Sequence, residues 1–159
     1  MNKKKLTQWA CAFTFISLIL SGCGLANNPP VAGVWKANAE FGSVDFTVSP
    51  DSTQIMDATF NFTNFQCGPG SQSGSIQVSY NNGLKIDNGQ INIELQNNVS
   101  SPVPPDPFNP IPPSMDTQII TLTGKFTSDG KSASGNWVAM FNGATCSQGK
   151  WNAVPNTTK

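Results

Sequence analysis

Apolar and polar residues alternate along most of the chain after residue 32, in short runs separated by turn residues. A period of two places one face of each run on a core and the other in water, as in antiparallel sheets. No window keeps a helical period over three turns. The pattern predicts an all-β domain of about seven to nine strands, either a small antiparallel barrel or a two-sheet sandwich. The alternating apolar positions are Val44, Phe46 and Val48; Met56, Ala58, Phe60 and Phe62; Ile76, Val78 and Tyr80; Ile91, Ile93 and Leu95; Ile120, Leu122, Gly124 and Phe126; and Trp137, Ala139 and Phe141.

Turn residues separate these runs. Residues 49–52 (SPDS), 81–83 (NNG), 87–89 (DNG) and 128–130 (SDG) have the composition of hairpin turns. Two of the turns belong to a recurring layout, in which Phe-Thr precedes a turn with Asp51 or Asp129 and a cysteine follows 16 or 17 residues after the aspartate. The recurrence suggests two related hairpins.

The motif Gly-x-Trp-x-Ala occurs three times, at residues 33–37, 135–139 and 149–153. In a strand its three named residues share one face, where glycine and alanine leave room for a neighbouring indole. We expect the tryptophans to fill the core and to hold the first strand against the last two. The alternative is a ligand-stacking platform, with Trp137 and Trp151 as contacts.

The first copy, Gly33-Val34-Trp35, resembles the Gly-x-Trp motif of lipocalins and avidin-like barrels, in which the first strand closes the barrel. This resemblance implies a closed or nearly closed barrel. Lipocalins also place a basic residue, usually arginine, over that tryptophan from a late strand. The chain has no arginine, so Lys150 is the candidate for that position.

The first residues have the parts of an export signal: three lysines at 3–5, an apolar run to Leu20 and then small residues. Leu20-Ser21-Gly22-Cys23 resembles the lipobox of bacterial lipoproteins. The resemblance implies a signal peptide over residues 1–22, acyl chains such as palmitate anchored at Cys23, and a tether over residues 23–32. Gly24 carries no inner-membrane retention signal, which implies the outer membrane if the organism is Gram-negative. The alternative is conventional cleavage after Ala26.

The other cysteines have separate interpretations. Cys11 lies in the signal and leaves with it, whereas Cys67 and Cys146 remain in the exported chain. Because export leads to an oxidising compartment, we expect these two to form a disulfide rather than two separate buried thiols.

One segment departs from the alternating pattern. Residues 100–114 (SSPVPPDPFNPIPPS) contain seven prolines, which prevent ladder pairing and favour an extended polyproline II conformation. The segment is either a stiff surface loop or a protruding contact element with Phe108 near its tip. We therefore expect a single β domain over residues 33–154 that includes this loop, followed by a tail at 155–159.

Charge and composition narrow the chemistry. Removing the three signal lysines leaves six lysines against nine acids, about −3, which disfavours nucleic acid as a partner. The chain lacks histidine and metal-binding cysteine pairs, so we expect no metal site and no cofactor. Candidates for carboxylate catalysis are Glu40 and Glu94, together with Asp45 and Asp57, which we expect on the solvent face of one hairpin, near each other.

We therefore expect a lipid-anchored protein of the cell envelope that is not an enzyme and that binds a protein or glycan partner. The sequence leaves open whether it faces the periplasm or the cell surface. Two alternatives remain at this stage. The first is an inhibitor of a lysozyme- or protease-type hydrolase, and the second is a carboxylate-dependent hydrolase.

Overall fold

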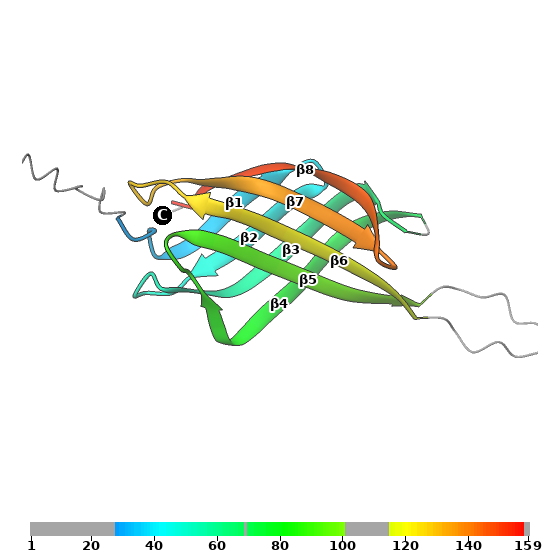
Figure 1. Ribbon diagram of the computed structural model, residues 1–159, viewed down its shortest axis with the longest axis horizontal. Helices are drawn as coiled ribbons and strands as arrows, with labels where there is room; N and C mark the ends of the chain where they lie inside the picture. The colour runs from blue at the N-terminus through cyan, green and yellow to red at the C-terminus, as the bar shows by residue number, and fades with distance from the viewer. Residues whose placement is uncertain (1–27, 69, 101–114, 158–159) are drawn as a thin grey trace, which may run out of the picture.

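A computed structural model describes residues 28–68, 70–100 and 115–157, which form eight antiparallel strands in one curved sheet (Figure 1). The strands are β1 (Gly33–Ala39), β2 (Gly42–Val48), β3 (Gln54–Gln66), β4 (Ser71–Lys85), β5 (Gln90–Ser100), β6 (Met115–Phe126), β7 (Ala133–Phe141) and β8 (Ala144–Pro155). The all-β prediction is confirmed. Of the two predicted architectures, the sheet adopts the barrel, which is nearly closed.

The sheet order is β4-β3-β2-β1-β8-β7-β6-β5, so almost every strand pairs with its neighbour in sequence. The barrel closes where β1 pairs with β8, for example Ala37 opposite Ala153. β4 and β5 follow each other in the chain but lie at the two edges of the sheet, and no ladder joins them. We call the line between these two edges the seam.

The barrel interior is filled by side chains from the inward face of each strand. Trp35, Phe46 and Phe60 are fully buried, and Ile93 and Leu122 contribute equally buried aliphatic groups. Trp35 stacks on Phe46 and meets Phe126 edge-on, with ring centroids 4.9 Å apart. Small barrels of eight strands are just wide enough to be filled in this way.

Two copies of the Gly-x-Trp-x-Ala motif fit each other across β7 and β8. Gly135 lies opposite Trp151, and Trp137 lies opposite Gly149, so each indole faces the glycine of the other copy. The Trp151 ring also lies against Gly124 on β6. Its Nε1 atom donates to the carbonyl oxygens of Thr123 and Asn136, each at 3.1 Å. With β1 paired to β8, the three copies occupy three adjacent strands, as predicted.

The recurring turns around Asp51 and Asp129 share one hydrogen-bond pattern. Ser49 Oγ donates to Asp51 Oδ1, and Thr127 Oγ1 donates to Asp129 Oδ1, both at 2.5 Å. Each carboxylate also accepts a backbone N–H from two residues further on. These hydrogen bonds lower the pKa of both aspartates, and the bonds from the Ser49 and Thr127 hydroxyls have the largest effect. The two turns therefore form the same local structure from different sequences.

Two predictions about β3 and β4 were wrong. Met56 was expected on the core face but is 38% exposed, and Ile55 is buried instead. Residues 81–83 (NNG) were expected to form a hairpin turn but lie inside β4. The register changes here from Ile55–Leu84 to Asp57–Ser79, so residues 80–83 bulge out opposite Met56. Against β2 the register passes from Thr47–Asp57 to Val48–Ile55, so Met56 is an extra residue of β3 and faces outward. On its other side, the bulge in β4 uses the NNG sequence as a bend.

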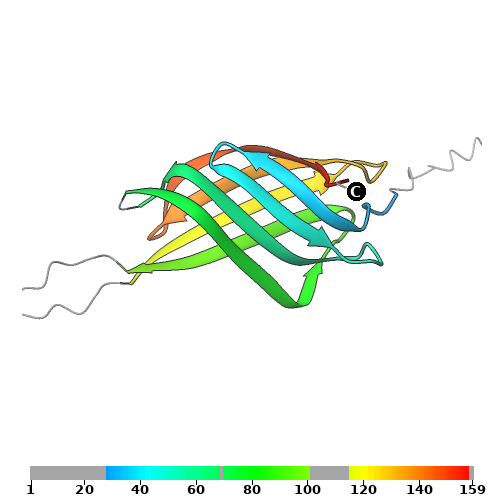
Figure 2. The same ribbon diagram turned by 180° about the vertical axis from the view of Figure 1, so that it is seen from behind.

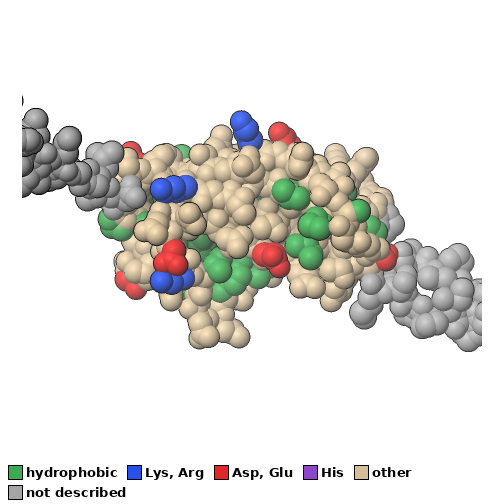
Figure 3. Space-filling model, viewed as in Figure 1, with side chains coloured by type: hydrophobic (Ala, Val, Ile, Leu, Met, Phe, Trp, Pro, Cys, Tyr) green, Lys and Arg blue, Asp and Glu red, His purple; other side chains and the backbone are tan. Residues whose placement is uncertain are grey.

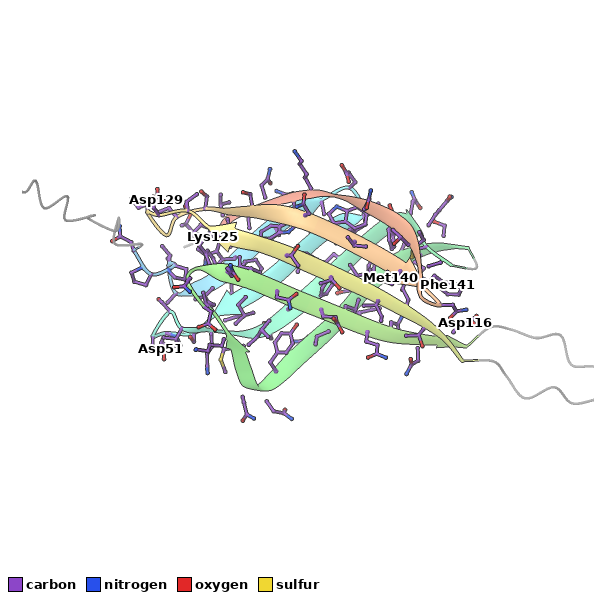
Figure 4. All side chains as sticks on the ribbon, viewed as in Figure 1. Asp51, Asp116, Lys125, Asp129, Met140 and Phe141 are labelled. Carbon is purple, nitrogen blue, oxygen red and sulfur yellow. A yellow bond between two sulfur atoms is a disulfide. The ribbon has the colours of Figure 1, made fainter. Side chains whose placement is uncertain are left out.

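The two ends of the barrel carry different parts of the chain. Residues 28–32 lead into β1 and the chain leaves β8 at one end, which we call the terminal end (Figure 1, Figure 2). β5 ends and β6 begins at the opposite end, where Ser100 faces Met115. This opposite end, which also carries the β1–β2, β3–β4 and β7–β8 turns, is called the loop end. Figure 4 labels Asp51 and Asp129 at the terminal end and Asp116 and Phe141 at the loop end.

Candidate interaction surface

The loop end is closed by an aromatic side chain from the turn between β1 and β2. Phe41 is 1% exposed although it lies in a turn. Its ring contacts Phe62 and Phe65 and meets Trp137 edge-on, with centroids 4.9 Å apart. This aromatic cluster stabilises the loop end as a packed surface rather than an open mouth.

A disulfide crosses the same end. Cys67 follows β3 directly and is joined to Cys146 on β8, 79 residues away in sequence. β3 and β8 are separated in the sheet by β2 and β1, so the bond links strands that do not pair. Cys146 sits where the β7–β8 register shifts, between Thr145 and Ser147. The prediction that Cys67 and Cys146 form a disulfide is confirmed.

Buried polar groups lie beneath this surface. Gln118 is fully buried, and its Nε2 atom donates to the Cys67 carbonyl oxygen at 3.0 Å. Within the described residues, its Oε1 atom and the Trp137 Nε1 atom are the buried side-chain groups that lack a hydrogen-bond partner. The Glu40 carboxylate lies over Gly149, close to the Trp137 indole. The sequence analysis did not predict the burial of Phe41 or Gln118. For Gln118 a signal was available, because it lies two positions before Ile120 and therefore on the same inward face of the strand.

The base of the proline-rich segment is held by Asn142 in the β7–β8 turn. Its Nδ2 atom donates to Asp116 Oδ1 at 2.9 Å, and its Oδ1 atom accepts the backbone N–H of Thr117 at 3.0 Å. The Asn142 backbone N–H donates to the Thr117 carbonyl oxygen. These bonds fix the start of β6, directly after residues 101–114. Phe108, the predicted contact residue, lies outside the described residues.

Apolar side chains reach the outer surface beside this base. Ile119 and Met140 face each other across β6 and β7, and both are half-buried. Phe141, opposite the buried Gln118, is also half-buried but packs against the core. Phe141 lies against Gly68 in the β3–β4 turn. Figure 3 shows hydrophobic side chains near this end over β6 and β7, and Figure 4 labels Met140 and Phe141 there. The loop end therefore offers a partly apolar surface on a rigid support.

The candidate carboxylates are distributed over different elements. Asp45 and Asp57 lie on neighbouring strands, each opposite a threonine rather than opposite the other. Asp45 accepts a hydrogen bond from Asn61, and Asp57 accepts one from Thr47. Glu94 lies on β5, and Glu40 lies in the β1–β2 turn. No group of three or more histidine, cysteine, aspartate or glutamate residues gathers in the part of the chain that the structure describes.

The remaining predicted site residues have clear positions. Trp137 and Trp151 are 1% and 3% exposed, so both belong to the core and neither presents a ring face to solvent. Lys150 is exposed and lies opposite Asn136, whereas the rings beside Trp35 are those of Phe46 and Phe126. Cys23 lies outside the described residues.

The fold and this surface together define an eight-stranded up-and-down barrel with a filled interior and an open seam. No family model matches the chain, and no curated protein or solved structure matches it. Residues 28–68, 70–100 and 115–157 contain no helix long and apolar enough to cross a membrane.

Proposed function

We propose that this protein is a lipid-anchored component of the cell envelope that acts as a non-enzymatic binding module. In this proposal the anchor at Cys23 holds the terminal end at the membrane, on the outer membrane of a Gram-negative cell. The loop end then faces away from the lipid and contacts a protein or glycan partner. The observation that carries the proposal is that the chain enters the filled barrel at one end, whereas Ser100 and Met115, which flank the proline-rich segment, lie at the other (Figure 1).

The entry of the tether into the barrel is fixed by hydrogen bonds. The backbone N–H of Asn28 donates to the Ser128 carbonyl oxygen, and that of Val31 donates to the Gly130 carbonyl oxygen. Trp35 Nε1 donates to the Val31 carbonyl oxygen at 2.7 Å. These contacts support a fixed orientation of the barrel on its tether, since residues 28–31 lie along the β6–β7 turn.

The barrel also separates the two ends by a useful distance. β6 has 12 residues. At about 3.3 Å per residue and a tilt of roughly 40°, such a strand spans about 30 Å along the barrel axis. A partner at the loop end is therefore held clear of the lipid headgroups.

Replacing the proline-rich segment tests the proposal. Because Ser100 and Met115 face each other, residues 101–114 can be exchanged for Asn-Gly, which favours a two-residue hairpin turn. We expect this variant to fold as the wild type does and to lose the specific partner in pull-downs from envelope extracts. A glycine-serine segment of 14 residues is the control for loop length.

Identical partner sets for the wild type and both variants would contradict a role for this segment. The intact mass of each chain, purified from the membrane fraction, distinguishes an acylated Cys23 from a chain that begins at Asn27. Inhibition of a lysozyme or protease panel by the wild type, lost in the Asn-Gly variant, would narrow the binding module to an inhibitor.

A further inference from the structure

The seam between β4 and β5 leaves two strand edges free. Every other neighbouring pair of strands in the barrel forms a ladder, but β4 and β5 end the sheet on either side. Among the described residues, no backbone hydrogen bond joins these two strands. Free edges present main-chain N–H and C=O groups at the spacing of a β-strand, and such edges pair readily with another extended chain.

A tyrosine side chain occupies the place of one ladder bond. Tyr80 Oη donates to the Glu94 carbonyl oxygen on the β5 edge at 3.2 Å. A tyrosine phenol is protonated at neutral pH and can donate. Burial first, and the nearby Glu94 carboxylate in addition, raise the pKa of Tyr80 from its ordinary value. The bond shows that the β5 edge is accessible to a donor that comes from outside the ladder.

The β4 side of the seam is incompletely covered. Ile76, Val78 and Tyr80 face the core side of the sheet but are only half-buried. On β5, the corresponding residues Ile91 and Ile93 are 3% and 0% exposed. Figure 3 shows a second hydrophobic area in this region, between β5 and β4. The bulge at residues 80–83 bends β4 away from β5 and leaves this row without a neighbouring strand (Figure 1).

The central part of the seam carries negative charge only. Glu94 is the one charged residue of β5, and β4 carries none before Lys85, at its end. Lys85 is paired with Asp87 at 2.8 Å. A chain that lies in the seam therefore meets an apolar row and a single carboxylate, which complements a basic side chain.

We propose that the seam binds an extended segment of another protein, which pairs through its main chain with the free edge of β4. Its alternate apolar side chains cover Ile76 and Val78, and a basic side chain lies beside Glu94. This mode is β-strand addition, in which the backbone supplies affinity and alternate side chains supply specificity. The inference goes beyond the proposed function, since the seam lies along the side of the barrel and not at the loop end.

A synthetic peptide tests the inference on the full-length, anchored chain in detergent. The probe has the 11-residue sequence of β5, Gln90–Ser100, with lysine at the position of Glu94. We expect it to bind, and we expect hydrogen exchange to slow at the amides of residues 75–80. The same peptide with prolines at the positions of Ile91 and Ile93 lacks two donors and should not bind. The protein variant Glu94→Lys should reverse the preference, so that the unmodified β5 sequence binds better than the lysine probe.

The Tyr80→Phe variant provides an independent measurement. It keeps the ring but removes the hydrogen bond that ties β4 to the Glu94 carbonyl oxygen, which a strand added to the β4 edge has to displace. We expect the probe to bind about fivefold more tightly, the equivalent of one net hydrogen bond of roughly 1 kcal/mol. Thr47→Val removes a comparable side-chain hydrogen bond on β2, away from the seam, and should leave binding unchanged.

Absence of binding, or exchange protection outside β4 and β5, would overturn the inference. Dimerisation of the chain that the probe competes away would assign the seam to a second copy and would also overturn it. If envelope partners are captured through the loop end while the probe does not bind, the proposed function stands and the seam inference fails. If the probe binds but no envelope partner is captured, the proposed function fails instead.

Discussion

Replacing both Cys67 and Cys146 by alanine should lower the free energy of unfolding by about 4 kcal/mol. The bond closes a loop of 79 residues, and the entropy that such a closure removes from the unfolded chain has this size. A domain of this length has a total stability of roughly 5–15 kcal/mol, so the loss is a large share. The bond also joins β3 and β8, which make no ladder with each other. Chemical denaturation of the wild type and the variant measures the difference directly.

Reduction of the wild type provides the matched condition for this experiment. The reduced wild type should unfold at nearly the same denaturant concentration as the double variant, and the oxidised wild type well above both. Equal midpoints for the oxidised wild type and the variant would contradict the stabilising role of the bond. Alanine is used at both positions so that no free thiol remains.

The substitution Gly124→Ala should destabilise the protein by about 3 kcal/mol, because overpacking in a filled core costs this much. A β-carbon at residue 124 would lie against the Ser134 carbonyl oxygen and the Trp151 ring, far closer than atoms pack. The ring cannot move away freely, since its Nε1 atom is held by the carbonyl oxygens of Thr123 and Asn136. Thermal and urea unfolding both report the loss.

Two further variants separate this packing effect from other causes. Ser134→Ala, at an exposed position on the neighbouring strand, should change stability by no more than about 0.5 kcal/mol. Trp151→Phe in the Gly124→Ala background should recover part of the loss, because the smaller ring leaves space for the methyl group. If the two substitutions are simply additive, the proposed contact between residue 124 and the indole is wrong.

The repeated Gly-x-Trp-x-Ala motif predicted the fold well because it combines a period of two with a size requirement. The same reasoning predicted that the tryptophans lie on adjacent strands. In the structure, Gly135 pairs with Trp151 and Trp137 pairs with Gly149, so each glycine makes room for an indole on the next strand. The pattern failed at Met56 because one bulge changes which side chains face inward without changing the sequence signal. Hairpin composition at residues 81–83 was equally compatible with a bend inside a strand.

The candidate surfaces were harder to predict because they depend on the closure of the barrel. The burial of Phe41 becomes apparent only when the barrel brings β3 and β7 beside the β1–β2 turn. The seam depends on which two consecutive strands do not pair, and a turn such as residues 87–89 gives no sign of this. Tyr80 appeared in the sequence as one more inward residue, whereas its hydroxyl reaches the opposite edge of the sheet.

Site-specific photo-crosslinking in intact cells tests most directly the central claim that the terminal end faces lipid and the loop end faces a partner. A crosslinking residue at Lys131, exposed in the β6–β7 turn, reports on the terminal end, and one at Thr145, exposed at the start of β8, reports on the loop end. We predict lipid adducts from position 131 and adducts to one envelope component, protein or glycan, from position 145. Lipid adducts from position 145, or partner adducts from position 131 alone, would contradict the account.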